Sequence, residues 1–296
     1  MRKTWHVIAL CALLLHAAGA ADTEANGFRP VNLFVGIANK AKHIAEDVKG
    51  AWHAQAGQDR VVAAIFDNKQ SGYFVDLAAN HPIYLSNTRT LERDFGWQGL
   101  CIDGNAELLN ELARHRTCTV VGSVVAAEKD SSITFRKFRA ANWQTNRSAW
   151  EHGLSGIVSS GTDNKPSWRQ WLFGQSKPSV DVDVVDEVAQ ATTLVNVLSS
   201  FGMPNSGIDY LSLDVEGAEW EVLRSFPFRT HTIRVITIER PSSRVRALLR
   251  SNNFTYARDI GVKLDELWLH GSMAHRLDAS RAFSCKNLKC VRVKGD

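Results

Sequence analysis

The sequence lacks several motifs that would assign a function directly. It contains no Gly-x-Gly-x-x-Gly run and no Walker-type lysine pattern, which disfavours a dinucleotide or nucleotide-sugar enzyme. It has no Cys-x-x-Cys pair, so its cysteines do not resemble a zinc site. It also has no long basic run and no repeated aromatic–basic pattern, so nothing indicates a nucleic acid partner. No internal repeat is present.

The apolar run at the start of the chain is too short to cross a bilayer, which takes roughly 20 residues. Arg2 and Lys3 precede the apolar stretch Val7–Leu15, and small residues follow at positions 18–20. This layout predicts a secretory signal peptide over residues 1–20, with a type II membrane anchor as the alternative. We therefore expect no stable membrane span after cleavage, and a location in the ER or Golgi lumen or outside the cell.

The mature chain is close to neutral. Loss of Arg2 and Lys3 lowers the count of Lys plus Arg from 35 to 33, against 31 Asp plus Glu, which again gives no argument for nucleic acid. The triplets Asn146-Arg-Ser148 and Asn253-Phe-Thr255 become N-glycosylation acceptors if the chain is secreted. Nothing in the sequence sets an oligomeric state.

The cysteines fit an oxidising compartment. Five are present, and removal of Cys11 with the signal peptide leaves an even number. Cys285 and Cys290 lie close together, and we favour a disulfide that closes a small loop between them. Whether Cys101 and Cys118 form a second disulfide is left open, because a pair of buried inert thiols explains them equally well.

Strand and helix patterns alternate along most of the chain, which predicts an α/β fold with a mostly parallel sheet. The expected core strands are Tyr73–Leu77, Gly99–Ile102, Thr117–Val125, Ile208–Val215 and Ile233–Ile238. Further strands are expected at Ile133–Phe138, Val180–Val185, Phe254–Ala257 and Leu267–His270. The expected helices are Gln55–Phe66, Ser86–Phe95, Ala106–Arg114, Thr193–Phe201, Gly217–Leu223 and Ser243–Arg250.

Three core strands end in an aspartate, namely Asp76, Asp103 and Asp214. Ligands bind at the carboxyl ends of strands in such sheets, and acids there suit ribose hydroxyls and a cationic group. Asp103 is alternatively a cap for the helix that begins near Asn105. These positions point to a cofactor that contains a nucleoside.

Glu216 and Glu219 follow Asp214 closely. Crowded carboxylates raise one another's pKa or hold a cation, so a general base, a contact to a cofactor amine and a hard-metal site are all open. For Glu219 we prefer a simpler role as an acid at a helix N-terminus.

A set of motifs occurs in a characteristic order: Gly57-Gln-Asp59, Gly72-Tyr-Phe-Val-Asp76, Ala79-Asn80, Ser86-Asn-Thr88, Leu91-Glu92, Gly96-Trp-Gln-Gly99, Leu154-Ser-Gly-Ile157 and Asp209-Tyr-Leu-Ser-Leu-Asp-Val-Glu-Gly-Ala-Glu219. Together they resemble the FkbM-type family of S-adenosylmethionine-dependent methyltransferases. The resemblance runs from about Gln55 to about Leu269. It implies a class I methyltransferase-like (Rossmann-like) fold, with a mostly parallel seven-stranded sheet, helices on both faces and one antiparallel strand.

The resemblance also implies roles in binding S-adenosylmethionine. Asp76, Ala78 and Asn80 would surround its methionine part, and Asp103 would hold its ribose. Ser123 and Val124 would lie near the adenine, and Asp214 would face the reactive end. No metal ligand is assigned. Ala78 stands where the family usually has glycine, and Asp103 where it usually has glutamate.

Methyl transfer to a hydroxyl requires that the acceptor proton be removed. We assign the catalytic role to Asp214, Glu216 and Glu239, and take His152 as a third candidate base after the two glutamates. The resemblance favours O-methylation of a hydroxyl on a sugar or small metabolite, so the expected partner is a small-molecule or glycan acceptor. The alternative is a non-catalytic protein of this fold that binds or traffics secretory partners.

The expected organisation is a signal peptide (1–20), an N-terminal extension (21–50), a methyltransferase-like domain (51–275) with an insertion (140–179), and a C-terminal tail (276–296). The insertion carries four tryptophans, which either line an acceptor pocket or form a satellite hydrophobic cluster: Trp143, Trp150, Trp168 and Trp171.

Overall fold

The computed structural model describes residues 49–140, 146–164, 182–202, 204–261, 265–281, 283–286 and 289–292. The predicted signal peptide, nearly all of the predicted extension and much of the predicted insertion lie outside these residues. Trp143, Trp168 and Trp171 are among those outside, so their predicted role in an acceptor pocket stays a prediction.

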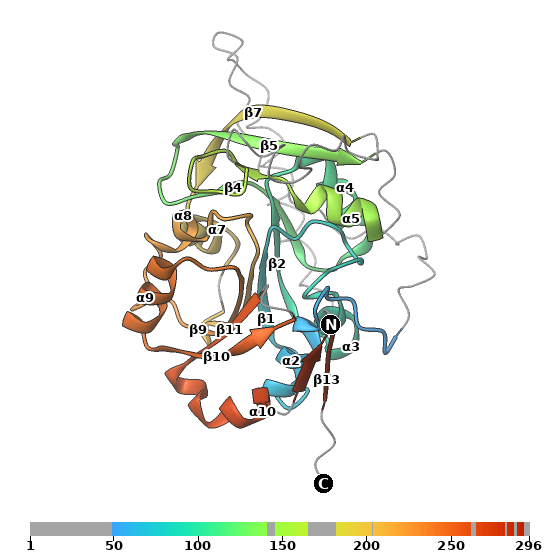
Figure 1. Ribbon diagram of the computed structural model, residues 1–296, viewed down its shortest axis with the longest axis vertical. Helices are drawn as coiled ribbons and strands as arrows, with labels where there is room; N and C mark the ends of the chain where they lie inside the picture. The colour runs from blue at the N-terminus through green and yellow to red at the C-terminus, as the bar shows by residue number, and fades with distance from the viewer. Residues whose placement is uncertain are drawn as a thin grey trace, which may run out of the picture.

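A seven-stranded sheet forms the centre of the molecule (Figure 1). Its spatial order is β10 (Phe254–Ile260), β11 (Asp265–His270), β9 (Ile233–Glu239), β8 (Ile208–Leu213), β1 (Tyr73–Leu77), β2 (Gln98–Asp103) and β3 (Thr119–Gly122). Strand β11 runs antiparallel to both of its neighbours, and the other neighbouring pairs are parallel. The predicted α/β class with a mostly parallel sheet is confirmed. The sheet is mixed rather than purely parallel, and it is compatible with a methyltransferase fold.

Helices cover both faces of this sheet because side chains along each strand alternate between the faces. In β1, Phe74 packs into one hydrophobic cluster, whereas Val75 and Leu77 pack into another. The first cluster is completed by α2 (Gln58–Ile65), α3 (Arg89–Phe95) and α4 (Ala106–His115). The second is completed by α7 (Leu194–Phe201), α8 (Glu219–Leu223) and α9 (Ser243–Ser251). Figure 1 shows the two groups of helices on opposite sides of the central strands.

Local signals in the sequence set several helix ends. Asn105 caps α4, since its side chain accepts a hydrogen bond from the Glu107 N–H, and Thr193 caps α7 in the same way. Gly96 ends α3 with a left-handed backbone, a conformation that glycine adopts at little cost.

A second sheet lies beyond the carboxyl ends of the central strands, with β5 and β7 across the top of Figure 1. Its order is β4 (Val124–Val125), β7 (Val182–Thr192), β5 (Ser132–Ala140) and β6 (Gly156–Ile157). The prediction of one strand over Thr117–Val125 was wrong. The Ser123 N–H donates to the Asp103 carbonyl at 2.9 Å, and the chain then leaves the central sheet to pair with β7.

Cys101 and Cys118 form a disulfide that joins β2 to the residue just before β3, with a Cα–Cα distance of 6.0 Å. This settles the pairing that the sequence left open. After β11 come a 3-10 helix η1 (Gly271–Arg276), α10 (Leu277–Arg281) and the hairpin β12 (Phe283–Lys286)–β13 (Lys289–Arg292). The hairpin register places Cys285 opposite Cys290, and their predicted disulfide stays a prediction.

No helix in the described part of the chain is both long enough and apolar enough to cross a membrane.

Candidate active site

The carboxyl ends of β1, β8 and β9 meet at a cleft of about 370 Å³. Of the predicted site residues, it is lined by Asp76, Ala78, Asn80, Asp214, Glu216 and Glu239. A smaller hollow of about 40 Å³ shares Ala78 and Asn80 with the cleft and is also lined by Asp103, Ser123, Val124 and His152. The fold therefore brings all predicted site residues to one edge of the sheet, while their individual roles stay predictions. Glu219 is buried and lines neither space.

The backbone around the cleft is strained at several non-glycine residues. Five of its lining residues have φ in the left-handed region, where a Cβ atom is disfavoured: Ala78 (65°), Asn80 (51°), Leu85 (60°), Glu216 (52°) and Arg240 (37°). Such conformations persist only where the surrounding structure enforces them, and they gather at functional sites.

Three side-chain oxygens of cleft residues are buried without a hydrogen-bond partner: Asn80 Oδ1, Asn87 Oδ1 and Asp214 Oδ1. Asn80 donates through its Nδ2 to the Ala149 carbonyl at 2.7 Å, and Asn87 through its Nδ2 to Ser212 Oγ at 3.0 Å. Because buried acceptors are costly to leave unpaired, this arrangement suits a ligand that presents several N–H donors or a positive charge. Sequence reasoning missed Asn87, although it lies inside the quoted Ser86-Asn-Thr88 motif.

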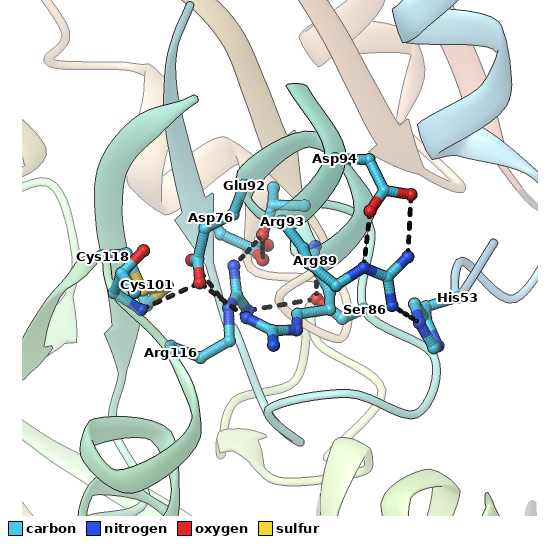
Figure 2. A network of polar contacts seen from close by, with 12 residues as sticks. His53, Asp76, Ser86, Arg89, Glu92, Arg93, Asp94, Cys101, Arg116 and Cys118 are labelled. Atoms are coloured by element: carbon cyan, nitrogen blue, oxygen red, sulfur yellow. Dashed lines mark hydrogen bonds and ion pairs between the residues drawn. A yellow bond between two sulfur atoms is a disulfide. The ribbon is translucent and has the colours of Figure 1, made fainter. Parts of the chain in front are cut away.

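A buried polar network contacts the carboxyl group of Asp76 and fixes its position (Figure 2). Thr88 Oγ1 donates to Asp76 Oδ2 at 2.5 Å and accepts from Arg116 Nη2 at 2.8 Å. Burial raises the pKa of Asp76, and the nearby Arg116 charge opposes that rise. The carboxylate is thus fixed in place at the end of β1.

The positive charge of Arg116 is balanced within the same network. Its Nε donates to Glu92 Oε2 at 2.9 Å, and Glu92 Oε1 accepts from Arg89 Nη1 and from the Thr117 N–H, each at 2.8 Å. The side chain of Arg116 is fully buried. Figure 2 shows the Cys101–Cys118 disulfide beside these groups, so the network and the disulfide lie against the same part of the sheet.

Asp103 accepts hydrogen bonds from the loop that follows β1 and from the loop that follows β2. Its Oδ2 accepts from the Asn80 N–H at 2.8 Å and its Oδ1 from the Asn105 N–H at 2.7 Å. Burial raises the pKa of Asp103 to about 6, against the effect of these two hydrogen bonds. Each carboxylate oxygen can accept a further hydrogen bond, so Asp103 keeps the acceptor capacity to bind ribose hydroxyls. The cap of α4 itself is Asn105, which answers the alternative raised for Asp103.

Acidic side chains crowd the side of the cleft formed by β8 and β9. Burial, together with Glu239 and Glu216, raises the pKa of Asp214 well above its usual range. Burial and Glu239 likewise raise the pKa of Glu216, and burial raises that of Asp265 to about 7. Because like charges this close cannot all ionise together, the crowding favours the protonated forms of Asp214 and Glu216.

His152 is less well placed for a role as base. Its Nδ1 lies 2.8 Å from the Phe138 carbonyl, and burial lowers its pKa. It lines the small hollow beside Asp103 rather than the cleft that holds the acids.

Sequence reasoning also missed Arg240, which follows Glu239 directly. Its Nη2 lies 2.6 Å from Asp163 Oδ2, 2.9 Å from Glu239 Oε2 and 3.4 Å from Glu216 Oε2. These three acids are close enough together to hold a metal ion. The guanidinium of Arg240 contacts all three carboxylates, which therefore form an ion-pair cluster around it.

The opposite wall of the cleft comes from α5 (Asn146–Gly153) and includes Trp150, which is 39% exposed. Of the four tryptophans in the predicted insertion, this is the one in the described residues, and it lines the cleft.

A family model described as "Methyltransferase FkbM domain" matches residues 76–256. The match covers more than half of the chain and runs from Asp76, at the end of β1, into β10. The chain therefore belongs to the FkbM methyltransferase domain family, and the predicted family is confirmed. Searches of curated proteins and of solved structures gave no match.

Proposed function

We propose that the protein uses S-adenosylmethionine to methylate a hydroxyl group of a sugar or small metabolite in the secretory pathway. Membership of the FkbM family supports methyl transfer. The cofactor, the acceptor and the compartment are inferences from the residues of the site.

The observation that carries the cofactor assignment is the set of partnerless oxygens on Asn80, Asn87 and Asp214. The methionine part of the cofactor carries an ammonium group with three N–H donors, which would satisfy acceptors of this kind. Asp103 would then accept from the ribose hydroxyls, and Ser123 and Val124 would border the adenine.

When bound, S-adenosylmethionine supplies a methyl group that is already activated on a sulfonium. The chain has to align the acceptor and exclude water, and the walls of the cleft would do both. Glu216 and Glu239 would take the acceptor proton, and Asp214 lines the cleft beside them. Burial and Glu239 raise the pKa of Glu216, and a carboxylate of raised pKa is a better base than an ordinary one.

The charge of the cleft bears on the acceptor. The described residues that line it include Asp76, Asp214, Glu216 and Glu239 but only one basic side chain, Arg240. This balance disfavours an anionic acceptor. Trp150 offers an apolar ring face of the kind on which a sugar ring can pack.

Two features support the compartment. A buried disulfide joins Cys101 and Cys118, and such bonds persist mainly in oxidising compartments. Asn253, the acceptor of the second glycosylation triplet, is exposed. Mass spectrometry of protein secreted by a eukaryotic host should show cleavage after Ala20 and a glycan on Asn253 or Asn146. An intact N-terminus would contradict the secretory assignment.

The cofactor assignment is tested by calorimetry on the mature chain with S-adenosylmethionine and its demethylated product. We expect binding of both, and a loss of about 1.5–3 kcal/mol for Asp103→Ala, the cost of hydrogen bonds to a charged group. Asp183→Ala, at an exposed acid on β7, is the matched control and should bind as wild type. Absence of binding by the folded wild-type chain would refute the cofactor assignment and favour the non-catalytic alternative.

A further inference from the structure

A short stretch of chain forms one wall of both spaces at the site. This cover segment comprises residues 146–164, namely α5, β6 and the turn that ends at Asn164. Its residues Ala149, Trp150 and Leu154 line the cleft, and His152, Ser155 and Ile157 line the small hollow. The position of the cover segment therefore sets the shape of the whole site.

Arg240 connects the cover segment to the central sheet. Its Nη2 is 2.6 Å from Asp163 Oδ2 in the cover segment and 2.9 Å from Glu239 Oε2 at the end of β9. Both Arg240 and Asp163 are about one-third exposed, so the link lies at the mouth of the cleft. The left-handed φ of Arg240 (37°) shows that the surrounding structure enforces its placement.

The backbones beneath this link are in close contact. The Asp163 N–H donates to the Glu216 carbonyl at 2.9 Å, and a Cβ on Gly217 would lie 2.9 Å from the Asp163 nitrogen. A Cβ on Gly156 would lie 3.2 Å from that of Glu216. Since the cover segment and the loop after β8 are already in contact, the ion pairs of Arg240 with Asp163 and Glu216 can fix one relative position of the two.

We propose that Arg240 is a positioning residue, which fastens the cover segment over the cleft and holds the carboxylates of Glu216 and Glu239 at its mouth. The inference rests on the proposed function for its effect on cofactor binding, but not for its effect on the cover segment. Loss of the guanidinium frees Asp163 and leaves three neighbouring carboxylates without their shared counter-charge, so the cover segment opens more often.

The experiment uses the full mature chain and four variants: Arg240→Ala, Arg240→Lys, Asp163→Asn and the Arg240→Ala/Asp163→Asn double variant. Arg246→Ala is the matched control, because Arg246 is equally exposed and pairs with Glu266 outside the cleft. Hydrogen exchange followed by mass spectrometry reports on residues 149–164, and calorimetry gives the affinity for S-adenosylhomocysteine.

We expect Arg240→Ala and Asp163→Asn to speed exchange in the cover segment while β1 and β8 exchange as in wild type. The double variant should exchange no faster than Arg240→Ala alone, since both changes break one link and Asp163→Asn also removes one of the three neighbouring carboxylates. Arg240→Ala should weaken S-adenosylhomocysteine binding roughly tenfold, the effect of losing one hydrogen bond to a charged group. One nitrogen of Arg240 makes all three contacts, and the ammonium of Arg240→Lys keeps the charge and three donors, so this variant should restore affinity to within roughly threefold of wild type.

Three results would overturn the proposal: exchange of the cover segment in Arg240→Ala equal to that in Arg246→Ala, faster exchange throughout the molecule, or no recovery in Arg240→Lys. If the wild type does not bind S-adenosylhomocysteine, the proposed function fails. The exchange measurements then still decide whether Arg240 fastens the cover segment.

Discussion

Ala78 is the residue whose backbone least suits its side chain among those predicted to bind the cofactor. Its φ of 65° costs a residue with a Cβ about 1–2 kcal/mol, part of which is offset by the greater flexibility of glycine in the unfolded chain. We therefore expect Ala78→Gly to raise the free energy of unfolding by about 1 kcal/mol in urea titrations. Removal of the methyl group from the cleft should also tighten cofactor binding.

The next residue provides the control. Ala79 is buried, and its φ lies outside the left-handed region. Ala79→Gly should lower stability by about 0.5–1 kcal/mol. Equal effects of the two substitutions would show that backbone strain is not what distinguishes position 78.

Asp214 should matter more for function than for stability. Its pKa is raised by burial and by its acidic neighbours, so ionisation in the folded state is costly and stability falls as pH rises through that pKa. Asp214→Asn removes this cost, and we expect an unchanged or higher melting temperature at pH 7.5. Methyl transfer should fall by about 10²-fold or more, the low end of acid–base effects.

Until an acceptor is known, affinity for S-adenosylmethionine stands in for turnover in that experiment. A lower melting temperature with intact affinity would make Asp214 a structural acid. Full activity with full stability would count against placing the reaction at this edge of the sheet.

For single residues, the sequence predicted which side chains lie at the site better than it predicted which side chains they contact. Asp76, Asp103 and Asp214 could be found because an acid after an apolar strand marks the functional edge of a sheet. Asn87 and Arg240 could not, because their importance depends on contacts with Ser212 and Asp163, which are distant in sequence.

Among the elements, α3 and the turn after α4 depend on one buried cation. Arg116→Met would leave Glu92 with Arg89 as its remaining counter-charge, and breaking a buried ion pair in this way costs up to about 3–5 kcal/mol. Arg114→Met, on the same stretch but with a side chain 64% exposed, should cost less than about 0.5 kcal/mol. Urea unfolding of the two variants gives the comparison, and similar midpoints would show that the network does not stabilise the fold.

The disulfide between β2 and the start of β3 should stabilise the same region. It joins residues 17 apart in sequence, and closing a loop of that length is worth roughly 3 kcal/mol in the chain-entropy account. Cys101→Ala/Cys118→Ala should lose about that amount in chemical unfolding. Wild-type protein treated with reductant should shift in the same direction, and no shift in either case would mean that the bond adds no stability.

The elements that the sequence predicted well are those whose pattern is local. The bounds of β1 follow from its apolar run, and α3 ends where Gly96 predicts. The single strand expected over Thr117–Val125 failed, since the exit of the chain after Gly122 depends on the pairing of β4 with β7, which is distant in sequence. The length of β7 was also missed, because its pairing with β5 is what extends it.

For the whole molecule, buried acids predict an unusual dependence of stability on pH. Burial raises the pKa of Asp103 to about 6 and those of Glu219 and Asp265 to about 7. Between about pH 4 and pH 7 the folded chain therefore holds protons that the unfolded chain has lost. The free energy of unfolding should be higher at pH 5.5 than at pH 7.5, measured by urea titration.

Asp265→Asn should flatten this dependence, because the amide stays neutral at both pH values and its oxygen can still accept from Gln58 Nε2. A protein that is more stable at pH 7.5 than at pH 5.5 would show that these acids ionise freely in the folded state.

The position of β11 has a consequence for the order in which the protein can fold during synthesis. Residues 265–270 enter the sheet between β9 and β10, although they are made after both. Until residue 270 has left the ribosome, β9 presents an unpaired edge, the kind of surface through which nascent chains associate wrongly. The family match ends at residue 256, so a fragment cut at that boundary would keep this open edge permanently. A chain that stalls or is truncated before β11 should therefore be a substrate for chaperones rather than a smaller folded domain.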